Sequence, residues 1–208
     1  MTVILVLAMF VTFLTIERFT NKPAPAYVAP AIEKNAAIVE PLTHGFSVPT
    51  NLHYHPNHTW ALGESPNYTR VGLDDFGTKL IGKADKIDLP TRGQWVRQGQ
   101  KMVTITRNGK SITLTSPIEG TVNEINDVLA KNPELFGTSD CYGAGWLFAV
   151  QAPDQKICFR NLMDSSLAKK MVSTEVQSFG STLAQDGGVA VNDFAGNTWE
   201  EACHKFLE

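Results

Sequence analysis

Two short runs of β-branched residues joined by Asn108-Gly109 constrain this chain more than any other feature. An Asn-Gly pair tolerates positive φ at both central positions of a type I′ turn, whose twist matches that of paired strands. On both sides of the pair, apolar residues alternate with Thr and Ser, which is the period of a strand with one buried face. The alternating apolar residues are Val103, Ile105, Ile112 and Leu114. Residues 103–115 therefore predict a β-hairpin around which the rest of the chain is organised.

Several short motifs lie on both sides of this hairpin: His58-Thr59-Trp60, Val71 to Phe76, Asp88-Leu89-Pro90, Gly93 to Val96, Gly99-Gln100, Ser116 to Val122, Asn132 to Leu135 and Tyr142 to Phe148. In their residues and their order, these motifs resemble those of the glycine cleavage system H protein. The resemblance covers roughly residues 51–154. It implies a mainly β (α+β) fold of the lipoyl type, a flattened β-barrel or hammerhead sandwich with short helices, in which a hairpin projects a lysine.

The lysine position is where the sequence departs from the family it resembles. H proteins carry lipoate on a lysine at this hairpin tip, in a Glu-Ser-Val-Lys-Ala-like context. An ungapped match from Gly99 to Pro117 puts Gly109 on the lysine position and Thr106 on the glutamate position, so Lys110 comes one residue late. One residue changes the face on which a strand side chain lies. We therefore predict a chain without a cofactor, with Lys110 as a solvated side chain; the alternative is lipoate attached to Lys110 in a reshaped turn.

Composition argues against several other classes of function. The formal net charge is only −3, so no strong field of one sign favours nucleic acid as a partner. The three cysteines Cys141, Cys158 and Cys203 lack the spacing of a metal knuckle or a disulfide framework, and reduced thiols are the simplest account. A reactive thiol at Cys141 or Cys158 is a weaker hypothesis. No phosphate-binding loop or nucleophile–base pair stands out, so the sequence does not predict an enzyme.

One histidine cluster also raises the question of a metal site. His53 and His55 would share one face of a strand and His58 follows a turn later, but Pro56 interrupts the strand. Carboxylates or thiols at a supporting spacing are absent. We predict no metal, and the resemblance assigns His58 to the opening strand of the fold.

The N-terminal residues 1–20 predict a transmembrane anchor. Met1 to Ile16 is almost wholly apolar and as a helix would span about 24 Å of the roughly 30 Å hydrocarbon core. A secretory signal and a buried core helix are the alternatives, but no positive charge precedes the apolar run. Arg18 and Lys22 follow the run, which favours a cytoplasmic body and a single-pass membrane protein. Residues 21–50 are rich in Pro and Ala and predict an extended linker.

The C-terminal part predicts helices. Within residues 155–184, Asn161 and Asp164 suit the N-cap and N3 positions of a helix with an apolar stripe. Residues 185–208 combine a glycine-rich, flexible segment with a terminal amphipathic helix. Trp199 and Phe206 lie on its apolar stripe, which would dock either on the body of the same chain or in a groove of a partner, with these two residues as candidate anchors.

These features lead to two hypotheses of function. The first is a non-catalytic, membrane-anchored H-protein-like subunit that acts as a structural module among other subunits of a membrane complex. The second is a lipoyl carrier modified on Lys110, as in a glycine cleavage-type system.

Deleting residues 1–22 should move the protein from the membrane fraction to the soluble fraction with its body folded, because the apolar run would be the only bilayer contact. Sedimentation after alkaline extraction, followed by circular dichroism, measures both properties. Deleting residues 23–41 instead keeps the apolar run and should leave the protein in the membrane. Aggregation of the first variant would show that the segment belongs to the core.

Overall fold

The computed structural model describes residues 42–138 and 140–185. The predicted anchor at 1–20, most of the predicted linker, and the terminal helix with Trp199 and Phe206 lie outside these residues. Within the described part, no helix combines the length and apolar character needed to cross a bilayer.

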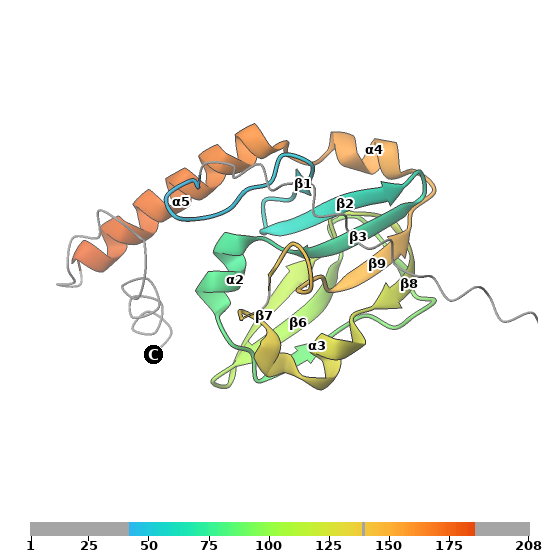
Figure 1. Cartoon of the computed structure of the whole chain (residues 1–208), viewed down its shortest axis with the longest axis horizontal. Coiled ribbons are helices and arrows are strands. Elements are labelled where there is room, and N and C mark those ends of the chain that lie inside the picture. The colour runs from blue at the N-terminus through green and yellow to red at the C-terminus, as the bar shows by residue number, and fades with distance from the viewer. Residues whose placement is uncertain (1–41, 139, 186–208) are drawn as a thin grey trace, which may run out of the picture. The chain divides into compact units, whose positions relative to one another are not determined.

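The secondary structure is mainly β, as the resemblance implies (Figure 1). The strands are β1 (His53–Tyr54), β2 (Thr59–Ser65), β3 (Tyr68–Leu73), β4 (Lys86–Asp88), β5 (Trp95–Val96), β6 (Lys101–Arg107), β7 (Lys110–Thr115), β8 (Gly120–Ile125) and β9 (Phe148–Gln151). The helices are α2 (Asp75–Ile81), α3 (Asp127–Lys131), η1 (Pro133–Leu135), α4 (Gln155–Arg160) and α5 (Ser165–Gln185).

In the described part of the chain, two antiparallel sheets form the body. The larger has six strands in the order β1-β2-β3-β9-β8-β5, and the smaller has three in the order β4-β6-β7. Strands β6 and β7 form the predicted hairpin, with Arg107 paired to Lys110 across a two-residue turn. Asn108 and Gly109 have φ of 49° and 74°, as a type I′ turn requires. The prediction of this hairpin is confirmed.

The main core lies between the two sheets. The alternating residues of the hairpin supply one side of it, since Val103, Ile105 and Leu114 are buried, whereas Ile112 near the tip is 40% exposed. The opposite side comes from β3, β8 and β9, through Val71, Leu73, Val122, Phe148 and Val150. The period-2 pattern of the sequence therefore corresponds to a sheet with one buried face.

A second core joins the other end of the large sheet to the C-terminal helix. Tyr54 and Trp60 are fully buried against Ala168, Val172 and Val176 of α5. Figure 1 shows α5 running beside β1 and β2, with α4 continuing along the same side. The helix is thus part of the folded body.

The C-terminal helical region differs in detail from the sequence prediction. Residues 155–185 form two helices, and Asn161 caps the C-terminus of α4. Asp164 is the residue that begins α5, because its carboxylate accepts the backbone N–H of Leu167 at 2.9 Å. A side-chain acceptor three residues ahead of an N–H defines an N-cap, so the start of the helix moves from Asn161 to Asp164.

Replacing Gly120 with Ala should destabilise the fold on the order of 4 kcal/mol, because φ is 150° there and a Cβ would lie 2.1 Å from the carbonyl oxygen of Gln151. Urea unfolding followed by tryptophan fluorescence measures the loss. Gly99 also has positive φ, but no atom lies within 4 Å of the position that its Cβ would take. Gly99→Ala should therefore lose only about 1 kcal/mol. Equal losses of unfolding free energy in the two variants would contradict a steric role for Gly120.

Candidate functional site

The tip of the β6–β7 hairpin places Lys110 on the core-facing side of the small sheet. Residues directly opposite each other in an antiparallel pair share a face, so Arg107 and Lys110 lie on the same face as the pair Ile105 and Ile112. Thr106 and Ser111 occupy the other face, where their hydroxyl oxygens are 3.0 Å apart. Lys110 is exposed and is the first residue of β7 after the turn.

The turn also shows why a lysine does not suit position 109. Gly109 has φ of 74°, a conformation that residues with a Cβ rarely adopt. Lys110 already belongs to the extended strand. Position 110 is the residue of the second strand nearest the tip, and a lysine fits there without backbone strain.

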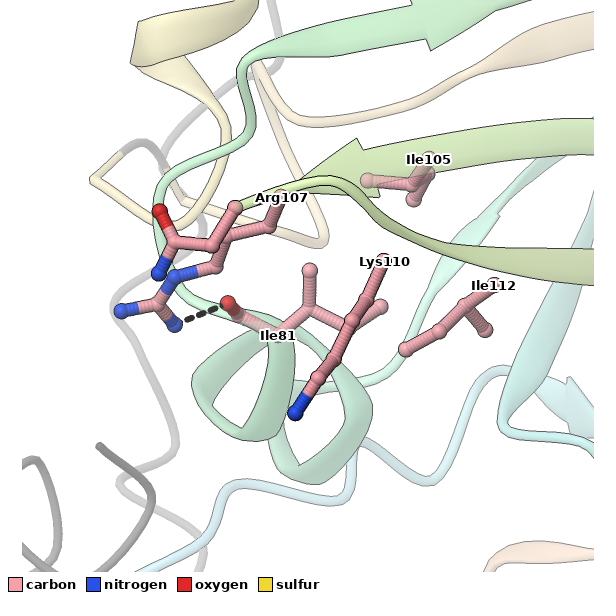
Figure 2. Close-up of a pocket in the computed structure, with 6 residues that line it drawn as sticks. Ile81, Ile105, Arg107, Lys110 and Ile112 are labelled. Carbon is pink, nitrogen blue, oxygen red and sulfur yellow. Dashed lines mark hydrogen bonds between the residues drawn. The ribbon is translucent and has the colours of Figure 1, made fainter. Parts of the chain in front are cut away.

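Two hydrogen bonds fix the hairpin tip to the end of α2 and to the segment that follows it. The Arg107 guanidinium donates to the carbonyl oxygen of Ile81 at the last turn of α2, drawn as a dashed line in Figure 2. The backbone N–H of Asn108 donates to Asp85 Oδ2 at 2.7 Å. A cation at the C-terminal end of a helix also interacts favourably with the helix dipole. The tip is therefore held at a defined place on the body.

An apolar hollow of about 130 Å³ lies between this tip and α2. Ile81, Ile105 and Ile112 supply its apolar surface, and Arg107, Asn108 and Lys110 complete its lining. Figure 2 shows the Lys110 and Ile112 side chains extending from β7 toward Ile81. The sequence did not indicate this hollow, because Ile81 comes from a different element.

A second cluster of charged groups lies around His58. Its Nδ1 is 2.9 Å from Asp74 Oδ2, and its Nε2 is 3.0 Å from Glu175 Oε2 on α5. Asp74 is buried and also caps α2 by accepting the Gly77 N–H at 2.7 Å. The imidazole thus joins the start of α2 to the C-terminal helix.

The two carboxylates control the protonation of His58. Burial lowers the pKa of His58, but its contacts with Asp74 and Glu175 outweigh this and raise the pKa to about 10. Burial raises the pKa of the Asp74 carboxyl, although His58 and the Gly77 N–H lower it. The ionised Asp74 therefore depends on the imidazolium beside it. No sequence signal linked Glu175 to this pair.

The other histidines and cysteines occupy separate places. His53 stacks on Phe159 with ring centroids 4.1 Å apart, and His55 accepts the Asn57 N–H at 3.1 Å. No group of three potential metal ligands occurs among the described residues. Cys141 and Cys158 are buried, and burial with nearby carboxylates raises the pKa of Cys141, which disfavours a reactive thiolate.

The stabilising effect of the His58 cluster should disappear at high pH. Because the pKa of His58 is about 10 in the folded state and about 6.5 unfolded, its contribution is complete below pH 6.5 and is lost as the pH rises toward 10. Urea unfolding at pH 6.5, 8 and 10 should show wild type losing roughly 3 kcal/mol more than His58→Gln. His55→Gln, in which the replaced histidine has a pKa lowered by burial, should follow wild type. If the free energy of unfolding falls equally with pH for wild type and His58→Gln, His58 does not have the raised pKa assigned to it.

Comparison with known proteins identifies the family. The family described as "Glycine cleavage H-protein" matches residues 52–175. The glycine cleavage system H protein of Mycobacterium avium (strain 104) is 34% identical over 107 residues, which cover 51% of this chain and 80% of the relative. The H protein of Xanthomonas euvesicatoria pv. vesicatoria (strain 85-10) is 32% identical over 109 residues, covering 52% and 82%. A crystal structure of an H protein from Mycobacterium marinum has a TM-score of 0.47 at 26% identity, and covers 50% of this chain and 86% of that chain.

This match corrects the prediction made for the cofactor. A chain without a cofactor was predicted because Lys110 is displaced by one residue, but the relatives are glycine cleavage H proteins, which carry lipoate. A shift of one residue in a tight turn was therefore too weak a reason to exclude the cofactor. The matched region covers both sheets and the first half of α5, and the chain belongs to the glycine cleavage H-protein family.

Proposed function

We propose that this chain is a lipoyl carrier of a glycine cleavage-type system, with lipoate attached through an amide bond to Nζ of Lys110. The observation that carries the proposal is the position of Lys110 in a chain of this family: it is exposed and directly follows the turn of the central hairpin. Lipoate would supply a dithiolane that exchanges a group with partner enzymes. The protein itself would be a carrier without a catalytic site of its own.

The anchored hairpin tip supports this assignment. A modifying enzyme must recognise a lysine at a defined place, and the hydrogen bonds from Arg107 to Ile81 and from Asn108 to Asp85 hold the turn in one position. The extended backbone of Lys110 directs its side chain away from the strand axis. The backbone of Lys110 therefore stands at a fixed point, while its four-carbon stem and the lipoyl chain provide reach.

The predicted anchor at residues 1–20 belongs to the same proposal. It would tether the carrier to a membrane, and the Pro- and Ala-rich stretch that follows would act as an extended spacer. Enzymes that load and unload the dithiolane would be the main partners, and Trp199 and Phe206 would provide a second contact for subunits at the membrane.

The intact mass of the protein purified from its native source tests the attachment. We expect an increment of one lipoyl group, mapped to Lys110 by peptide analysis, because this is the lysine displayed at the tip. Lys110→Arg keeps the charge and should abolish the increment. Lys101→Arg, at the other end of β6, is the matched control and should leave it unchanged. An unmodified wild-type protein, or modification at another lysine, would contradict the proposal.

A further inference from the structure

The hollow beside the hairpin tip has the size and surface of a small apolar binding site. Its apolar surface comes from three isoleucines on α2, β6 and β7, two of which, Ile81 and Ile105, are buried in the core. An apolar cavity of about 150 Å³ in another protein holds benzene and otherwise stays dry. A hollow of about 130 Å³ therefore accommodates an aliphatic group of about six carbons.

The charged residues that line this hollow are both basic. They are Arg107 and Lys110, and none of its described lining residues is acidic. Asp85 is nearby, but its Oδ2 accepts the Asn108 N–H at 2.7 Å. A guanidinium carries five N–H donors, and the bond from Arg107 to the carbonyl oxygen of Ile81 uses one of them. An anion beside Arg107 and Lys110 would therefore meet two cations.

We propose that this hollow binds a short linear carboxylate, with its alkyl chain against the isoleucines and its carboxylate beside Arg107 and Lys110. The binding is non-covalent, and no bond forms or breaks. The site is proposed for the chain with an unmodified Lys110, because lipoylation would turn the ammonium into a neutral amide, whereas an arginine at this position keeps a cation. The chemical class of the ligand follows from an apolar pocket of limited depth beside two positive charges.

The test uses the full chain carrying Lys110→Arg, which removes the candidate attachment site and keeps the charge. The chain is placed in lipid nanodiscs, and butanoate, hexanoate and octanoate are titrated by calorimetry, with empty nanodiscs as the blank. Affinity should rise about fourfold for each added methylene up to hexanoate, since each buried methylene contributes to transfer, and should then level off. Hexanamide should bind at least tenfold more weakly than hexanoate.

Matched variants locate the site. Ile112→Ser should weaken hexanoate binding at least tenfold while leaving the melting temperature close to that of its parent, because Ile112 is 40% exposed. Ile157→Ser changes another accessible isoleucine on α4, outside the hollow, and should leave binding unchanged. Failure to bind any carboxylate, equal affinity for hexanamide, or equal effects of the two serine variants would overturn the proposal. Lipoylation of the wild-type chain is measured by mass and is decided separately.

Discussion

The pairing register of β6 with β7 is the constraint on which the rest of the structure depends. The two-residue turn pairs Arg107 with Lys110, and this places every second residue of both strands on the face that packs against the large sheet. A shift of one residue would turn Val103, Ile105 and Leu114 toward solvent and bring Thr side chains into the core. The buried faces and the turn therefore select the same register.

The same register joins the core to the functional tip. Arg107 and Lys110 continue the buried face beyond Ile105 and Ile112, so the charged ends of the hairpin extend over the end of α2 instead of lying on the outer side of the sheet. Hydrogen bonds to Ile81 and Asp85 then hold the tip in place. The pairing of β6 with β7 thus determines the packing of the core, the shape of the hollow and the position of Lys110.

At the other end of the molecule, ion pairs beside an apolar core join α2 to α5. His58 lies between the cap of α2 and Glu175, next to a core in which Trp60 and Tyr54 pack on α5. Removing one member would leave a buried carboxylate uncompensated, which is far less favourable than an intact pair. This cluster explains how a helix beyond the predicted domain boundary at residue 154 becomes part of the body.

Local signals were sufficient for much of the fold. The Asn108-Gly109 turn and the alternation along both strands were predicted, because turn chemistry and strand period depend on residues close in the chain. The family resemblance was confirmed, but the cofactor prediction was wrong, since a shift in alignment does not show where a side chain lies. The placing of Ile81 and Ile112 around one hollow, and the contact of His58 with Glu175, were decided only by the tertiary structure. Residues distant in sequence leave no local pattern that shows which of them will meet when the apolar faces are buried.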